Sequence, residues 1–78
     1  MNASGDFKIA VKECTKAIQI DPKAVKAYFN RSQAYRKLFS FDEATEDLKA
    51  AIKLNPQDKK LRSEFESLKE EKKKHAMS

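Results

Sequence analysis

Glycine, proline and cysteine are scarce in this chain, whose 78 residues include one glycine, two prolines and one cysteine. A single glycine excludes the glycine-rich loops that cradle phosphate groups. One cysteine and one histidine exclude an internal disulfide, and also a zinc site built within one chain. No catalytic group of side chains can be recognised. The sequence therefore favours a protein that is not an enzyme and that uses neither a cofactor nor a metal.

Long apolar runs are also missing. No stretch approaches the roughly 20 apolar residues that span a bilayer, and the first residues, MNASGDFK, lack the apolar centre of a secretory signal. The lone cysteine, Cys14, is typical of a reducing compartment. We therefore expect a protein of the cytoplasm or nucleus with no membrane segment.

Charge is abundant but mixed. Charged residues make up 37% of the chain and leave a formal net charge of +5, which attracts acidic peptides, acidic surfaces and nucleic acids without selecting among them. The basic run near the end is interrupted by Glu70 and Glu71 and has no aromatic residue, so it argues against nucleic-acid binding. His75, in this charged tail, is expected to be simply solvated.

Two segments of the chain resemble each other at a distance of 34 residues. Residues 5–22 align with residues 39–56 without a gap, and the repeated step indicates an internal structural repeat. The identical pairs are Phe7 with Phe41, Ala10 with Ala44, Ala17 with Ala51, Ile18 with Ile52, and Pro22 with Pro56.

Local signals predict an all-α fold of about four helices, at residues 6–20, 23–38, 41–54 and 57–76. Asp6, Ser40 or Asp42, and Asp58 are suitable first-turn caps, and Pro22 and Pro56 stop the helices before them. Connections this short make neighbouring helices antiparallel. Alanines at the repeated positions permit close helix contact, and the aromatic residues fill the space between helices.

These residues resemble the tetratricopeptide repeat, a 34-residue pair of antiparallel helices. Residues 23–56 match one full repeat, residues 5–22 match the second helix of a partial repeat, and residues 57–76 suit a capping helix, so that 1–78 form a single module. Arg31 departs from the family, which usually has leucine there, and its charged end is expected to extend outward. The matching residues of the full repeat are Tyr28, Ser32, Tyr35, Ala44, Leu48, Ala51 and Pro56.

A polar stripe runs along the second expected helix. Lys26, Asn30, Gln33 and Lys37 are three or four residues apart and therefore share one face, opposite the packed tyrosines. In stacked helix pairs such a face lines a concave surface, and Lys60 is expected to face it across the groove. The stripe is either an ordinary solvated surface or a peptide-binding site.

The segment also resembles the last repeat and capping helix of co-chaperone tetratricopeptide domains, such as those of immunophilins. That resemblance implies binding of the acidic C-terminal tail, Glu-Glu-Val-Asp, of heat-shock chaperones through a clamp of Lys, Asn and Arg side chains. Lys26 matches the clamp lysine, but Asn30 stands where the last repeat usually has Arg. In a second alignment, Asn30 is the clamp asparagine, Lys60 the next lysine, and Glu64 replaces an Arg.

A structural role is the alternative to peptide binding. The first helix lacks the partner that would precede it in a complete repeat, and its apolar face cannot be covered by one neighbour. Exposed apolar surface favours association with another copy. The sequence therefore leaves open a homodimer formed through Phe7, Val11, Cys14 and Ile18.

Overall fold

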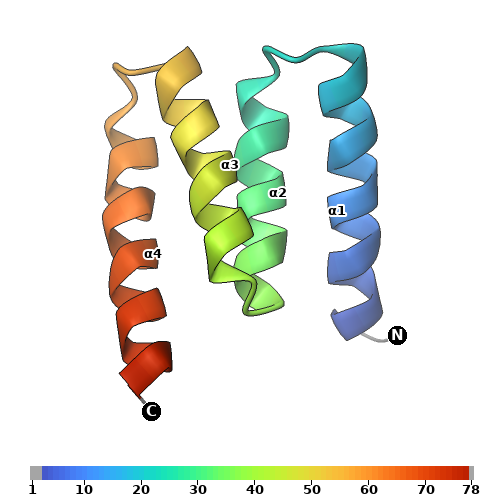
Figure 1. Cartoon of the computed structure of the whole chain (residues 1–78). Coiled ribbons are helices and arrows are strands. Elements are labelled where there is room, and N and C mark those ends of the chain that lie inside the picture. Colours follow the sequence, from blue (N-terminus) through green and yellow to red (C-terminus); the bar gives the residue numbers. More distant parts are fainter. Residues whose placement is uncertain (1–2, 78) are drawn as a thin grey trace.

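The computed structural model describes residues 3–77, and it describes the side chains of residues 6–76. These residues form four helices, α1 (Ala3–Ile20), α2 (Val25–Lys37), α3 (Phe41–Leu54) and α4 (Lys59–Met77). The helices run alternately up and down in one row, so that α1 and α4 lie at opposite ends of the row and the two ends of the chain lie along the same edge of it (Figure 1). The molecule is a slab measuring 38 × 34 × 17 Å. The predicted all-α class and its four helices are confirmed.

The helix boundaries differ from the predicted ones mainly at the starts. The first helix begins at Ala3 and includes Asp6 in its first turn, so the prediction that Asp6 caps it was wrong. Helix α2 begins at Val25 because residues 22–23 form a turn, in which the Asp21 carboxylate accepts the Lys23 N–H at 3.1 Å. Asp58 plays the same part before α4, accepting the Lys60 N–H at 2.9 Å. Ser40 occupies the cap position of α3 without a side-chain hydrogen bond.

The connection between α2 and α3 turns on Phe39. Its φ angle is 61°, which places a bulky residue in the left-handed region. The Phe39 N–H donates to the Arg36 carbonyl at 3.0 Å, and the Ser40 N–H donates to the Tyr35 carbonyl at 2.9 Å. This pattern ends many helices and usually places glycine at the left-handed position. In this chain a phenylalanine occupies the left-handed position instead of a glycine, and its backbone is strained there.

Small residues let α2 and α3 approach closely. Ala27 and Ala34 of α2 are buried, as are Ala44 and Ala51 of α3. Ser32 is buried too, and its hydroxyl donates to the Phe29 carbonyl at 2.7 Å, which satisfies it within its own helix. Larger side chains surround this contact and complete the core, namely Phe41, Leu48, Leu61 and Leu68, with Val25, Tyr28, Phe29, Tyr35, Ile52 and Phe65 partly buried against them.

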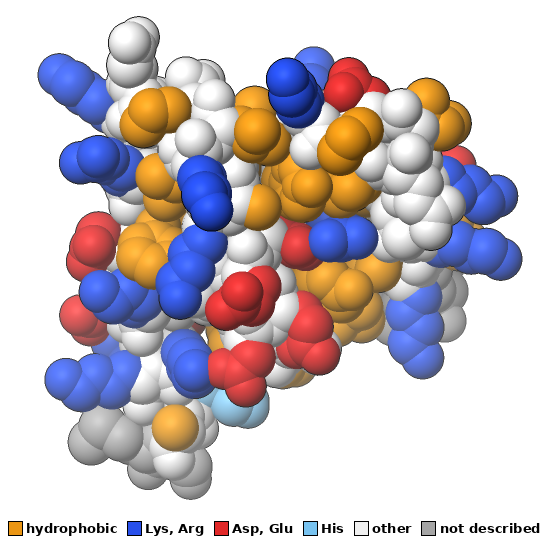
Figure 2. All heavy atoms as spheres, turned by 45° about the horizontal axis from the view of Figure 1, so that its top comes forward, with side chains coloured by type: hydrophobic (Ala, Val, Ile, Leu, Met, Phe, Trp, Pro, Cys, Tyr) orange, Lys and Arg blue, Asp and Glu red, His pale blue; other side chains and the backbone are white. Residues whose placement is uncertain are grey.

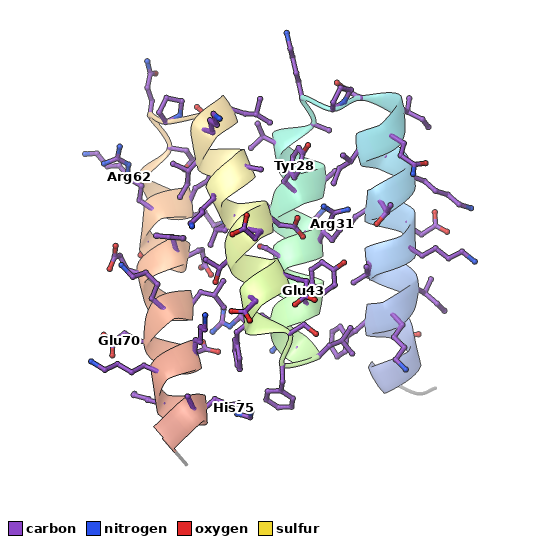
Figure 3. The ribbon with its side chains drawn as sticks, viewed as in Figure 1. Tyr28, Arg31, Glu43, Arg62, Glu70 and His75 are labelled. Carbon is purple, nitrogen blue, oxygen red and sulfur yellow. The ribbon has the colours of Figure 1, made fainter. Side chains whose placement is uncertain are left out.

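Arg31 turns inward, so the expectation that its charged end extends to solvent was wrong. Its Nε and Nη2 atoms donate to the Asp47 carboxylate at 2.8 and 2.7 Å, and its Nη1 donates to Thr15 Oγ1 at 3.1 Å. The guanidinium also lies 5.9 Å from the Tyr28 ring centroid and 6.0 Å from that of Tyr35. Figure 3 shows Tyr28 and Arg31 on the part of α2 nearest α1. One side chain thus joins α1, α2 and α3.

Helix α1 packs against α2 at the edge of the row (Figure 1). Its inward side chains Phe7, Val11, Cys14 and Ile18 are half-buried, whereas Ile9 and Ile20 are exposed. Ala10 and Ala17, which match the buried Ala44 and Ala51 of α3, are also only half-buried. The two halves of the sequence repeat therefore lie in different environments, because α3 has a helix on each side.

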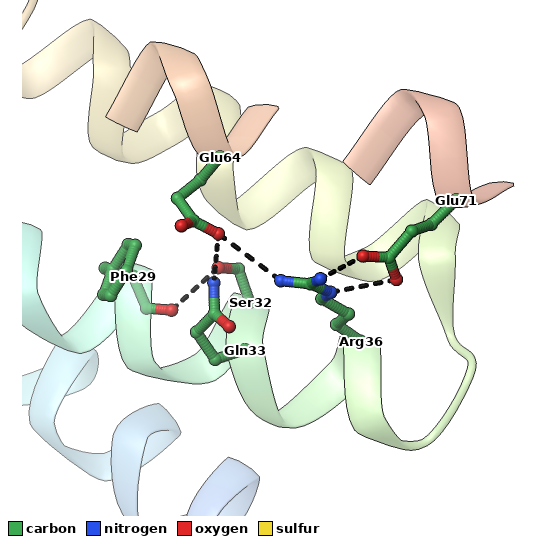
Figure 4. Close-up of polar contacts among 6 residues, drawn as sticks. All are labelled: Phe29, Ser32, Gln33, Arg36, Glu64 and Glu71. Carbon is green, nitrogen blue, oxygen red and sulfur yellow. Dashed lines mark hydrogen bonds and ion pairs between the residues drawn. The ribbon is translucent and has the colours of Figure 1, made fainter. Parts of the chain in front are cut away.

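Helix α4 packs its narrow apolar stripe on α3, with Leu61 and Leu68 buried and Phe65 half-buried. Ionic contacts fasten the same helix from two sides. Arg36 of α2 donates through Nε to Glu71 at 2.9 Å and forms an ion pair with that carboxylate (Figure 4). On the other side, Lys72 pairs with Asp42 of α3. The position of α4 is therefore set by both apolar and ionic contacts.

Candidate functional site

A groove of about 380 Å³ lies between the start of α2 and the start of α4. It brings together three of the residues selected from the sequence, Lys26, Asn30 and Lys60. Lys26 and Asn30 come from successive turns of α2, and Lys60 comes from the first turn of α4. All three are exposed, so their polar ends are accessible. The remaining lining residues are Val25, Phe29, Asp58 and Leu61.

The floor of the groove is apolar. Leu61 is buried, and Val25 and Phe29 are half-buried beside it. The Lys60 ammonium lies 5.7 Å from the centroid of the Phe29 ring, within the range of a cation–π contact. A ligand in this groove would meet apolar surface below and amide and ammonium groups at the rim. Such a combination suits a peptide with both apolar and acidic groups.

Gln33 and Lys37 lie farther along α2 and do not line this groove. The Gln33 side-chain amide donates to Glu64 of α4 at 3.1 Å, so in this state it holds α4 and not a ligand (Figure 4). Lys37 is exposed and makes no ion pair among the described residues. The predicted stripe is thus divided into three parts. Lys26 and Asn30 line the groove, Gln33 contacts α4, and Lys37 is exposed to solvent.

Carboxylates near the groove are largely engaged by the protein itself. Glu64 accepts from Gln33 and forms an ion pair with Arg36 at 3.4 Å. The hydrogen bond to Glu71 raises the pKa of the Arg36 guanidinium, with burial acting in the opposite direction. Arg36 therefore stays charged and offsets Glu64. The groove itself is lined by two cations, Lys26 and Lys60, and by one carboxylate, that of Asp58.

Several residues that line the groove or pair with the carboxylates near it were not identified as functional from the sequence. The aromatic residues, Phe29 among them, were expected to fill the space between helices, and Val25, Leu61 and Arg36 were given no binding role. The signal for Arg36 was present in the spacing of Glu64 and Glu71, which lie seven residues apart and so occupy one face of α4. An acidic face on one helix and an arginine on its neighbour indicate such a contact.

Cys14 and His75 are the other chemically reactive side chains. Burial raises the pKa of the Cys14 thiol, and the nearby Arg31 charge opposes that effect in part. A half-buried thiol of raised pKa is a poor nucleophile at neutral pH. His75 is exposed, but its ring stacks on Phe39 at 5.2 Å between centroids instead of being simply solvated. Figure 3 shows His75 near the end of α4.

Among residues 3–77, no cluster of three or more His, Cys, Asp or Glu side chains is arranged to hold a metal ion.

None of the helices in the described part of the chain has both the length and the apolar character required to cross a bilayer.

The architecture of paired antiparallel helices with a groove between α2 and α4 defines a helical-repeat interaction module. Residues 25–58 match the family model of the tetratricopeptide repeat. This part of the chain forms a tetratricopeptide repeat. The matched residues comprise all of α2 and α3 together with the turn that follows.

The chain is also similar to the human mitochondrial import receptor subunit TOM70. The two are 43% identical over 44 residues, which is 56% of this chain and 7% of the receptor. The chain therefore corresponds to a small part of that protein. Both comparisons support a module for protein–protein interaction, since the tetratricopeptide repeat is a protein-interaction repeat.

Proposed function

We propose that this module binds an extended peptide with an acidic C-terminus in the groove between α2 and α4. The observation that carries the proposal is the convergence of Lys26, Asn30 and Lys60 at the rim of one groove with an apolar floor. Two ammonium groups and an amide can hold a terminal carboxylate through charge-assisted hydrogen bonds. The apolar floor formed by Val25, Phe29 and Leu61 accommodates an aliphatic side chain next to it.

The C-terminal tail of a heat-shock chaperone fits this chemistry. Its end, Glu-Glu-Val-Asp, offers a terminal carboxylate, acidic side chains and one aliphatic residue. The resemblance of the segment to co-chaperone domains supports this partner. Asn30 supplies one amide in place of the two parallel donors of an arginine, so the clamp is partial.

Gln33 and Lys37 extend the site along α2. Gln33 would contact the peptide main chain once its amide leaves Glu64, and Lys37 would attract an acidic side chain farther from the C-terminus. Glu64 faces the same path, and its ion pair with Arg36 reduces its repulsion of an acidic ligand. Weak affinity is therefore expected from residues 23–76 alone, because a complete clamp uses side chains from about three repeats.

The division of the chain follows from the same proposal. Residues 23–56 form the full repeat, residues 57–76 act as a capping helix, and residues 5–22 are the second helix of a partial repeat. In this arrangement the first helix of the full repeat and the capping helix form the two walls of the groove. A co-chaperone of the cytoplasm or nucleus is the setting we propose for it, in line with the single cysteine.

The test is a titration of the chain with a peptide ending in Glu-Glu-Val-Asp and with its C-terminally amidated twin, followed by fluorescence anisotropy at two salt concentrations. We expect the amidated peptide to bind about tenfold more weakly, because it lacks one charged group that two lysines contact. Added salt should weaken binding as it screens the exposed charges. The variants Lys26→Ala and Lys60→Ala should each reduce affinity.

Lys12→Ala is the matched control, since Lys12 is an exposed lysine of α1 on a helix that does not line the groove. It changes the net charge by the same amount and should leave affinity unchanged. Equal affinities for the free and amidated peptides would refute carboxylate recognition.

Self-association through α1 is a second candidate function. It is favoured by one observation, the exposure of Ile9 (58%) and Ile20 (85%) on a helix that packs against α2 at the edge of the row. A second copy of the chain could cover this face. Sedimentation equilibrium over a range of concentrations should then show a dimer that Ile9→Lys abolishes, and a monomer at all concentrations would exclude it.

A further inference from the structure

A second groove lies on the other side of α4, where that helix meets α3. It has a volume of about 370 Å³ and is lined by Lys49, Ile52 and Lys53 of α3 and by Arg62, Phe65 and Glu66 of α4. None of these six residues lines the groove between α2 and α4. The two grooves therefore use different faces of the same helix.

The floor of this second groove is apolar, because Ile52 and Phe65 are half-buried and reach the core only with part of their surfaces. The Lys69 ammonium lies 5.4 Å from the centroid of the Phe65 ring and adds a cation at its edge. Figure 2 shows basic side chains surrounding apolar ones on this side of the molecule, with acidic side chains gathered lower on the same face.

The rim carries an excess of positive charge. Lys49, Lys53 and Arg62 oppose a single carboxylate, that of Glu66. Glu66 itself is paired with Lys69 at 3.9 Å, while Lys49 is paired with Glu46 at 3.8 Å. These are exposed pairs at long distances and hold their charges weakly.

Within residues 6–76, Lys53 and Arg62 have no ion-pair partner. Both are exposed, and Figure 3 shows Arg62 near the start of α4. The recess thus has an apolar floor and an unpaired cation on each of two opposite walls, and these features indicate which ligand would be complementary to it. That ligand carries a bulky apolar side chain between acidic groups.

We propose that the α3–α4 groove docks an acidic amphipathic segment of a partner protein. A leucine or phenylalanine of the segment enters between Ile52 and Phe65, and flanking carboxylates pair with Lys53 and Arg62. Because the recess is concave, it fits an inserted side chain better than the flat surface of a membrane. This site recognises side chains within a segment and requires no terminal carboxylate, so it is independent of the groove between α2 and α4.

The probe for this site is a short synthetic peptide, amidated at its C-terminus, in which glutamates flank a pair of leucines. Its twin keeps the leucines and replaces every glutamate by lysine. Each peptide is titrated into the ¹⁵N-labelled chain, and amide chemical shifts are followed. We expect the glutamate peptide to perturb residues around Lys49–Lys53 and Arg62–Glu66, and the lysine peptide to leave them unchanged.

The variant Lys53→Glu with Arg62→Glu tests the charges directly. Both side chains are exposed, so the fold should be retained, which circular dichroism checks. The glutamate peptide should bind this variant about tenfold more weakly or worse, because two attractive contacts become repulsive. Lys12→Glu with Lys16→Glu is the matched control, with the same charge change on exposed positions of α1, and should bind normally.

Three outcomes would overturn the proposal. The first is equal binding of the glutamate and lysine peptides. The second is a set of shifts confined to the groove between α2 and α4, or a loss of binding in Lys26→Ala. The third is binding of anionic phospholipid vesicles that depends on Lys53 and Arg62 while the glutamate peptide does not bind, which would assign this face to a membrane surface.

Discussion

Arg31 and Asp47 face each other across the contact between α2 and α3 and share two hydrogen bonds of 2.8 and 2.7 Å. The arginine side chain is 18% exposed and the aspartate side chain 7% exposed. The hydrogen bond to Asp47 raises the pKa of the Arg31 guanidinium, so that it stays charged at every physiological pH. A pair of this kind is costly to bury and still more costly to break.

Replacing one member of this pair should therefore destabilise the protein. We expect Asp47→Ala to lower the free energy of unfolding by about 3 kcal/mol, because it leaves the Arg31 charge enclosed without its partner. Urea denaturation followed by circular dichroism at 222 nm measures this change. The double variant Arg31→Leu with Asp47→Leu removes both charges and should recover most of the loss, since apolar side chains can replace a buried pair. A double variant as unstable as the single one would contradict this account.

Arg36 should control how firmly α4 is attached. Arg36→Ala removes the contacts to Glu64 and Glu71, which are partly exposed, so we expect a loss of about 1 kcal/mol. Hydrogen exchange of the α4 amides should become faster, while that of the α2–α3 contact changes little. Arg62→Ala is the control, because this arginine on α4 has no ion pair within the described residues. Equal exchange in the two variants would exclude a fastening role for Arg36.

Phe39→Gly should stabilise the protein. Phe39 has a φ of 61°, which costs about 1 kcal/mol or more for a residue with a Cβ and nothing comparable for glycine. Phe39 is 65% exposed, so loss of its ring removes little buried surface, although it also removes the ring contacts with His75 and Phe41. We expect a rise in the melting temperature of about 4–8 °C per kcal/mol gained. Phe39→Ala removes the same ring but keeps the strain, so it should not share the gain.

The raised pKa of the Cys14 thiol predicts that the protein loses stability at alkaline pH. Burial raises the pKa of its thiol above the ordinary value of 9.0, so the unfolded chain loses the thiol proton at lower pH than the folded protein does. This contribution to stability is complete below pH 9 and is lost as the pH rises through the folded pKa. The difference in unfolding free energy between the wild type and Cys14→Ala should therefore shift against the wild type above about pH 9. A constant difference between pH 7 and 10 would contradict the raised pKa.

The sequence repeat was enough to predict the helices and much of the core. The alanines at positions 44 and 51 are buried as the 34-residue step requires. The same step placed Ala10 and Ala17 in equivalent positions, yet these are half-buried. Sequence similarity reports which face packs, but the degree of burial depends on how many neighbours a helix has.

The helical period predicted the polar stripe. It could not show which residues of the stripe line a groove and which contact another helix. Spacing along α2 places Asn30 and Gln33 on one face, but whether a side chain meets an open groove or another helix depends on the angle of α4. Gln33 therefore contacts Glu64 while Asn30 lines a recess. Arg31 was misassigned for a similar reason, because its partner Asp47 belongs to a helix whose position relative to α2 is set only by tertiary packing.

Because α1 contacts α2 while α3 has neighbours on both sides, the helices should not all separate at the same point of denaturation. Within the described residues, the hydrogen bond from Arg31 to Thr15 is the only polar side-chain contact that ties α1 to the rest. Partial unfolding should therefore begin by detachment of residues 3–20. This would expose the α1-facing surface of the α2 tyrosines and leave both grooves of α4 intact, so that ligand binding could outlast part of the native structure.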